Sequence, residues 1–175
     1  MGNVILALDL ATELGWAVGP ANGEPRFGHH ILPKTGDDIG HFALAYDRWL
    51  RDMLIREQPA AVVFEAPMPD TAGRTPMATS LKLKGLCWHT EYLCAKAGIR
   101  VVQEPASSWK KSICGTGRIS KAMRPYPVFV ALEQRGFRVS NHNAADALAL
   151  WIHALSVLSP RNATRFDPLF REVRA

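Results

Sequence analysis

The chain has 175 residues, enough for one domain whose core buries well over half of the surface that the unfolded chain exposes. Hydrophobic residues make up 47% of the sequence and charged residues 21%, and this composition excludes disordered, collagen-like and coiled-coil proteins. Lysine and arginine outnumber aspartate and glutamate by 21 to 16, so the formal net charge of +5 favours a polyanionic partner.

No segment has the character of a membrane span or a secretion signal. The longest nearly apolar stretch, residues 144–158, is interrupted by Asp146 and His153 and is too short for the roughly 30 Å of a bilayer's hydrocarbon core. The N-terminus lacks a basic segment, and Asp9 interrupts its apolar run, which indicates a first strand and an intracellular protein. The cysteines show no CxxC spacing, which argues against disulfides and a zinc site and favours buried thiols; they are Cys87, Cys94 and Cys114.

Strands and one helix are expected in the first third of the chain. Residues 3–10 form a continuous apolar run, which is typical of a strand covered on both faces. Further strands at 14–18 and 26–32 are separated by turn residues, so two hairpin connections are expected. Apolar residues at three-and-four spacing then predict an amphipathic helix over 38–57.

The rest of the chain alternates helices and strands. A short buried strand at 60–64 ends in Glu65, a loop follows to residue 76, and a long helix is expected over 77–97, with Gly98 as its C-cap. The remaining expected elements are a strand at 100–103, a polar and basic stretch at 105–121, a helix within 120–135, and a last helix at about 143–158 that Pro160 ends. This order predicts a single α/β domain over residues 1–158, followed by an Arg-rich tail at 159–175.

Three acidic residues occur at positions that a plain core does not explain. Asp9 lies on the face of the first strand that alternation assigns to Ile5 and Ala7, where an unpaired carboxylate costs about several kcal/mol. Glu65 closes a second buried strand, and Asp146 lies near the start of the last helix beside small alanines. Carboxylates suit Mg²⁺ or Mn²⁺, and two such ions about 4 Å apart can support phosphodiester hydrolysis. The alternative for each acid is a paired structural carboxylate.

The order of these motifs resembles the ribonuclease H-like superfamily. The string ILALDLATELGWAV is similar to its first hairpin, whose acid is a metal ligand, and VVFEAPMP is similar to the segment of its second acid. NHNAADALAL resembles the last helix of the RuvC-like Holliday junction resolvases, whose Asp-Ala-Leu signature supplies the final ligand. SLKLKGLCWHTEYLCAKAG and VVQEPASSWKKSICGTGRISK resemble the helix and the basic Gly-x-Gly segment in between, so the resemblance covers about residues 3–158.

The resemblance implies a ribonuclease H-like nuclease domain with a five-stranded mixed sheet, three antiparallel strands followed by parallel strands, flanked by helices. It implies a divalent-metal-dependent endonuclease of DNA recombination and repair that hydrolyses four-way DNA junctions as a homodimer. Asp9, Glu65 and Asp146 would hold Mg²⁺ or Mn²⁺, two ions per active site. The compact form indicates a phage or mobile-element member, located in the cytoplasm with nucleoid or phage DNA.

One position departs from the resembled motif. Cellular members commonly carry a second acid or a histidine three residues before the final aspartate, and here that position is Asn143, with His142 beside it. Asn143 can coordinate a metal through its side-chain carbonyl, and His142 can ligate a metal or position a water. Asn143 acting only as the N-cap of the helix is an open alternative, so the fourth ligand is unassigned.

Basic residues crowd the Gly115-Thr116-Gly117 turn, whose glycines allow backbone N–H groups to approach phosphate closely. The resemblance implies that lysines here contact phosphates near the cut site, and Lys121 is also a candidate catalytic residue. In the loop after Glu65, Met68 is expected to act as a wedge in the opened junction or, alternatively, to serve as packing. A solvated surface is the alternative for the charges. The candidate DNA-binding residues are Met68, Arg74, Lys82, Lys110, Lys111, Arg118, Lys121 and Arg124.

The apolar surface of the helix at 77–97 fits either a homodimer interface or a wholly intramolecular helix. Two other functions are compatible with the same fold. One is a nuclease for other branched or RNA-containing substrates, and the other is a non-catalytic DNA-binding scaffold, which the departure at Asn143 keeps open.

Overall fold

The protein is described by a computed structural model that covers residues 3–36, 38–67 and 77–170. Five strands form one sheet in the order β3-β2-β1-β4-β5. They are β1 (Val4–Asp9), β2 (Glu13–Pro20), β3 (Arg26–Ile31), β4 (Ala61–Glu65) and β5 (Arg100–Glu104). The first three strands pair antiparallel, whereas β4 pairs parallel with β1 and β5 pairs parallel with β4. The expected five-stranded mixed sheet is therefore confirmed.

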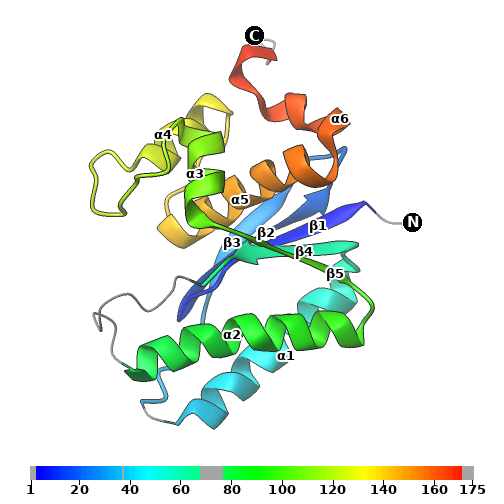
Figure 1. The fold of residues 1–175 in the computed structure, drawn as a ribbon, viewed down its shortest axis with the longest axis vertical. Coiled ribbons are helices and arrows are strands. Elements are labelled where there is room, and N and C mark those ends of the chain that lie inside the picture. Colours follow the sequence, from blue (N-terminus) through cyan, green and yellow to red (C-terminus); the bar gives the residue numbers. More distant parts are fainter. Residues whose placement is uncertain (1–2, 37, 68–76, 171–175) are drawn as a thin grey trace.

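Helices cover both faces of this sheet. Figure 1 shows α1 and α2 on one face and α3, α4 and α5 on the other. The helices are α1 (Ile39–Glu57), α2 (Met77–Lys96), α3 (Ala106–Cys114), α4 (Pro127–Gln134), α5 (His142–Leu158) and α6 (Pro160–Ala163), followed by the 3-10 turns η1 (Thr164–Phe166) and η2 (Pro168–Phe170). Within the described ranges, none of these helices is long and apolar enough to cross a membrane.

Alternation along β1 divides the core into two layers. Ile5 and Ala7 point into the layer beneath α5, which also contains the buried Trp151. Leu6 and Leu8 point into the opposite layer beneath α1 and α2. Because Asp9 follows the parity of Ile5 and Ala7, its side chain belongs to the face that α5 covers.

The start of α5 lies directly against β2 at a glycine. Gly15 is the register partner of Asp9, and a Cβ atom on Gly15 would lie only 1.9 Å from the backbone oxygen of Asn143. In the middle of the helix, Trp151 donates its indole N–H to the carbonyl oxygen of Ile5 at 3.0 Å. These two contacts set the first turn of α5 beside the end of β1, where Asp9 lies.

Helix α3 lies in the stretch 105–121, where the sequence indicates only a polar, glycine-punctuated segment. It buries only Trp109 and Ile113, a single pair at helical spacing, and Pro105 caps it with no side-chain hydrogen bond. The helix ends at Gly115, whose φ of 79° lies in the left-handed region that glycine adopts most easily. The expectation was wrong here because so short a helix gives almost no periodic signal.

The segment after α5 is also structured as far as residue 170. Pro160 ends the α5 pattern as expected but begins α6, and Phe166 is 5% exposed in the layer beneath α5. Arg165 donates to the backbone oxygen of Asn22 in the β2–β3 hairpin. Residues 160–170 therefore pack on the domain. The cysteines are free thiols, with Cys87 and Cys94 buried as expected and Cys114 half-buried.

Candidate active site

Side-chain oxygen atoms from the end of β1 and from the start of α5 converge on the ammonium of Lys121. Its Nζ lies 3.2 Å from Asp9 Oδ2 and 3.0 Å from Asp146 Oδ2, and it donates to Asn143 Oδ1 at 2.7 Å. Asn143 and Asp146 lie three residues apart on the first turn of α5, so both side chains share one face of the helix. The structure thus brings four of the candidate catalytic residues together.

This cluster carries an excess of negative charge inside the protein. The pKa of Asp9 is raised to about 7: burial raises it most, Lys121 lowers it, and the neighbouring carboxylates of Asp146 and Glu65 raise it. Burial lowers the pKa of Lys121, but Asp9 and Asp146 outweigh it, so the pKa of this lysine is raised. An additional cation at this position would relieve the repulsion among the carboxylates.

Asp146 is oriented by a buried tyrosine. Tyr126 donates its O–H to Asp146 Oδ1 at 2.6 Å, and both side chains are almost inaccessible to solvent. Burial first, and then the charge of Asp146, raise the pKa of Tyr126, so the hydroxyl stays protonated and keeps its role as donor. One oxygen of Asp146 is thereby held by Tyr126, while the other faces Lys121.

Glu65 is oriented in a similar way by α3. Trp109 is buried and donates its indole N–H to Glu65 Oε2 at 3.1 Å. Neither Trp109 nor Tyr126 could be identified from the sequence. No local signal marks them, because the contact to Glu65 spans 44 positions and the contact to Asp146 spans 20.

The structure assigns the N-cap of α5 to Asn141. Its Oδ1 accepts from the backbone N–H groups of Asn143 and Ala144 at 2.9 and 3.0 Å, and its Nδ2 donates to Glu13 Oε1 at 2.6 Å. The alternative that Asn143 serves only as the helix cap is therefore wrong, because its side chain accepts from Lys121 instead.

The imidazole of His142 packs between aromatic rings on the flank of the site. Its ring centroid lies 4.9 Å from that of Tyr126 and 4.7 Å from that of Phe129. His142 therefore contacts the ring of the tyrosine that orients Asp146. Its expected role as a metal ligand or water-positioning residue stays a prediction.

The donor atoms at this site fit Mg²⁺ or Mn²⁺ in their chemistry. Among residues 3–36, 38–67 and 77–170, no three His, Cys, Asp or Glu side chains are grouped so that they could hold one metal ion. Two carboxylates and an amide nevertheless direct oxygen atoms at a single positive charge, that of Lys121. Oxygen ligands are what these ions prefer, and the ammonium marks a position that these residues arrange for a cation.

The candidate DNA-binding residues lie on several elements. Lys110 lies over the ring of Trp109, with Nζ 5.2 Å from the centroid, and Lys111 and Arg118 line an open depression beside the Gly115–Gly117 turn. Arg124 donates to the carbonyl oxygens of Lys121 and Met123 in its own loop.

The other candidates lie away from this loop or outside the described residues. Lys82 lies on α2, where it donates to the backbone oxygen of Gly36 at 2.5 Å and lies over the ring of Phe42. Its contacts therefore belong to the face of the sheet that α1 and α2 cover. Met68 and Arg74 lie outside the described residues.

Comparison with known proteins places the fold. No family model matches the chain, and no curated protein sequence matches it. Thermus thermophilus RuvC superposes with a TM-score of 0.67 and 19% identity, covering 88% of this chain and 95% of that chain. The same protein in complex with a Holliday junction substrate gives 0.65 and 19%, covering 84% and 89%. The yeast mitochondrial Holliday junction resolvase Ydc2 gives 0.52 and 13%, covering 93% and 77%.

The sheet order and the helices on its two faces give the chain a ribonuclease H-like α/β fold. Within that class, the chain has the RuvC-like fold, as the resemblance of its motifs implies. None of these structures bears on a phage or mobile-element origin, which stays a prediction.

Proposed function

We propose that the protein is a divalent-metal-dependent endonuclease that cuts four-way DNA junctions. The observation that carries the proposal is the convergence of Asp9, Asp146 and Asn143 on one cationic group at the end of β1. Similarity of fold to RuvC and Ydc2 supports this substrate, because one neighbour is bound to a Holliday junction and the other is a Holliday junction resolvase. The net charge of +5 is consistent with a nucleic acid partner.

The residues have distinct roles in this proposal. Asp9, Asp146, Asn143 and Glu65 would hold the metal, with two ions per site. Bound Mg²⁺ or Mn²⁺ supplies activation of water and stabilisation of charge on the scissile phosphate. Lys121, which lies against Asp9 and Asp146, would contact the phosphate of the bound strand.

Two further groups keep the acids in place. Tyr126 holds one oxygen of Asp146, whose other oxygen faces Lys121, and Trp109 holds one oxygen of Glu65. Such preorganisation reduces the reorganisation that catalysis requires.

The proposal is tested with the Glu65→Gln variant, which keeps the shape of the side chain and removes its charge. Cleavage of a synthetic four-way junction should fall at least about a thousandfold, while junction binding stays within about threefold. Glu133→Gln, at an exposed position on α4, is the matched control and should cut at the normal rate. Full-rate cutting by Glu65→Gln would refute the assignment.

The substrate is tested by comparing a junction, a flap, an RNA–DNA hybrid and a plain duplex under identical conditions. Preferential cutting of the junction supports the proposal, and preference for another substrate supports the alternative nuclease function. If none is cut and neither Mg²⁺ nor Mn²⁺ binds, the protein is a scaffold.

We further propose that two copies pair through α2. Four large apolar side chains form an exposed stripe along this helix at helical spacing: Met77 is 80% exposed, Leu81 52%, Trp88 83% and Tyr92 54%. A two-fold dimer presents two active sites to two opposed strands of a junction. Sedimentation should show a dimer for the unaltered chain and a monomer for Trp88→Glu, and a monomer for the unaltered chain would contradict this interface.

A further inference from the structure

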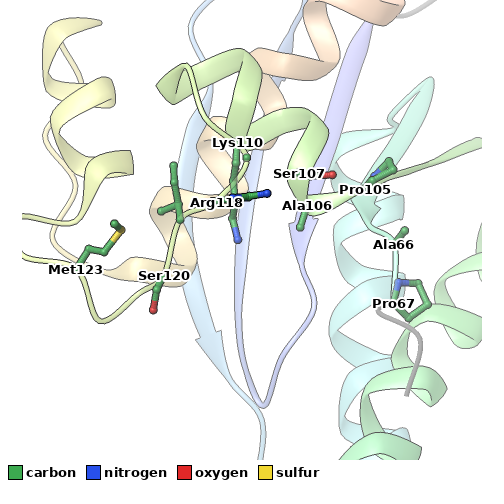
Figure 2. Close-up of a pocket in the computed structure, with 11 residues that line it drawn as sticks. Ala66, Pro67, Pro105, Ala106, Ser107, Lys110, Arg118, Ser120 and Met123 are labelled. Carbon is green, nitrogen blue, oxygen red and sulfur yellow. The ribbon is translucent and has the colours of Figure 1, made fainter. Parts of the chain in front are cut away.

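A pocket of about 710 Å³ opens beside the cluster of acids. Three segments border it: residues 66–67 after β4, residues 105–107 at the start of α3, and residues 117–120 of the basic loop. Figure 2 shows Ala66 and Pro67 on one side of the pocket and Ser120 and Met123 on the other, with Lys110 and Arg118 between them.

The chain connects this pocket directly to the acids. Ala66 follows Glu65, and Ser120 precedes Lys121, whose ammonium contacts Asp9 and Asp146. Lys110 lies over the ring of Trp109, the residue that holds Glu65. The pocket therefore lies next to the place where a phosphate bound at the acids would be.

The lining combines apolar walls with uncompensated positive charge. Ile119, Met123 and Pro67 contribute apolar surface, and Lys110 and Arg118 contribute two cations. In the part of the chain that the structure describes, neither cation forms an ion pair with a carboxylate. Apolar walls suit the faces of a nucleobase, and unpaired cations suit a phosphate.

The pocket has room for a single nucleotide. Its volume lies within the roughly 300–1,000 Å³ typical of small-molecule sites, whereas a base-paired duplex is too wide to enter. Unstacking a base costs about a few kcal/mol of free energy. The cost is lowest where stacking is already interrupted, as at the branch point of a junction.

We propose that this pocket binds one unpaired nucleotide of the strand to be cut, its base against Ile119 and Met123 and its phosphate between Lys110 and Arg118. The inference rests on the proposed function, since it assumes that the strand enters the site formed by the acids. Extraction of that nucleotide fixes the register of the neighbouring phosphate relative to Asp9 and Asp146. The pocket thus selects branched DNA over continuous duplex.

The experiment uses junctions that carry 2-aminopurine, one position at a time, at the nucleotides around the branch point. This base brightens when it leaves the stack, and EDTA prevents cleavage during the measurement. With the unaltered protein, one position should brighten by about threefold or more on binding. Ala106→Trp places an indole in the pocket and should abolish that signal even at saturating protein.

Ser112→Trp is the matched control, because it introduces the same side chain at an exposed position of α3 that does not line the pocket. It should brighten the base as the unaltered protein does. Met123→Trp, at the exposed edge of the same pocket, serves as the blocking variant if Ala106→Trp does not fold.

The cationic wall is tested by Lys110→Gln. Junction affinity should fall by about tenfold, and the salt dependence of binding should weaken by about one phosphate contact, whereas Arg138→Gln, at an exposed position outside the pocket, should change neither.

The experiments distinguish an error in the pocket proposal from an error in the proposed function. If the unaltered protein cuts junctions but no position brightens, or if both blocking variants brighten the base normally, the pocket proposal is wrong and the nuclease stands. If the unaltered protein neither binds nor cuts a junction, the proposed function is wrong and the pocket proposal is wrong with it.

Discussion

Lys121 Nζ lies 3.0 Å from Asp146 Oδ2, and this ion pair joins the basic loop to the first turn of α5. Because the same nitrogen also contacts Asp9 and Asn143, one positive charge lies against two carboxylates and an amide oxygen. We infer that the lysine occupies the position of a divalent cation in the metal-free protein and competes with it.

Replacing this lysine should therefore separate metal binding from catalysis. Lys121→Met should bind Mn²⁺ about tenfold more tightly, because the competing ammonium is gone, yet cut junctions at least about tenfold more slowly, because a phosphate contact is lost. Calorimetric titration with Mn²⁺ and single-turnover cleavage measure the two effects. Lys111→Met, in an exposed position of α3, should leave Mn²⁺ affinity unchanged. Weaker Mn²⁺ binding by Lys121→Met would contradict the competition.

The raised pKa of Asp9 makes stability depend on pH. The pKa is about 7 in the folded protein and 3.8 for an aspartate in an unfolded chain, so between these values the folded chain retains a proton that the unfolded chain has released. The free energy of unfolding therefore falls as the pH rises through this range, by at most about 4 kcal/mol at about 1.4 kcal/mol per pKa unit. Above pH 7 the full penalty persists.

Asp9→Asn removes this penalty. In EDTA, urea unfolding should show the variant more stable than the unaltered protein at pH 8 by about a few kcal/mol, and the difference should shrink toward pH 5. Asp52→Asn, at an exposed position of α1, provides the control and should follow the unaltered protein at every pH. A stability difference that does not vary with pH would show that Asp9 titrates normally.

The indole N–H of Trp109 is expected to position Glu65. Trp109→Phe keeps an aromatic ring in the core but removes the donor, so cleavage should fall by about tenfold while junction binding changes by less than about twofold. Mn²⁺ affinity is the second measurement and should also fall, which a loss of core packing alone would not cause. Trp49→Phe, at a half-buried position of α1 away from the site, is the control. Normal cleavage by Trp109→Phe would refute the positioning role.

The close contact between β2 and α5 predicts a strict requirement for glycine. Gly15→Ala places a Cβ atom 1.9 Å from the Asn143 backbone oxygen, so α5 must shift, and the free energy of unfolding should fall by about 3 kcal/mol or more. Gly85→Ala lies in the interior of α2 with open space around its Cβ, and it should be stabilising by up to about 1 kcal/mol. Chemical denaturation of both variants checks this contrast, which equal stabilities would contradict.

Much of the fold could be predicted because its core elements carry strong local patterns. β1 and β4 are continuous apolar runs, and the buried residues of α1 have helical spacing. The bounds expected from the sequence for these three elements therefore agree with the structure to within one or two residues. Helix α3 was missed because it buries only Trp109 and Ile113 and has no capping side chain. The same shortness concealed the role of Trp109, since helix α3 is what carries this side chain to Glu65.

The site could be predicted only in part for a related reason. Asp9 is visible as an acid within an apolar strand, and Asp146 lies among alanines. The contacts of Tyr126 and Lys121 with these acids depend on how the loop before α4 folds back onto α5, and no spacing in the sequence encodes that. The alternative that Asn143 caps α5 was wrong: Asn141 is the cap, and either asparagine satisfies the local preference.

The central claim, that the acids converge to bind a divalent cation, is tested most directly by anomalous diffraction from a crystal soaked in Mn²⁺. We expect a strong Mn²⁺ peak bordered by the carboxylates of Asp9 and Asp146, with the Lys121 side chain displaced from both, and no such peak in a crystal of Asp146→Asn. A Mn²⁺ peak elsewhere, or a Lys121 ammonium that stays between the two carboxylates at saturating Mn²⁺, would contradict it.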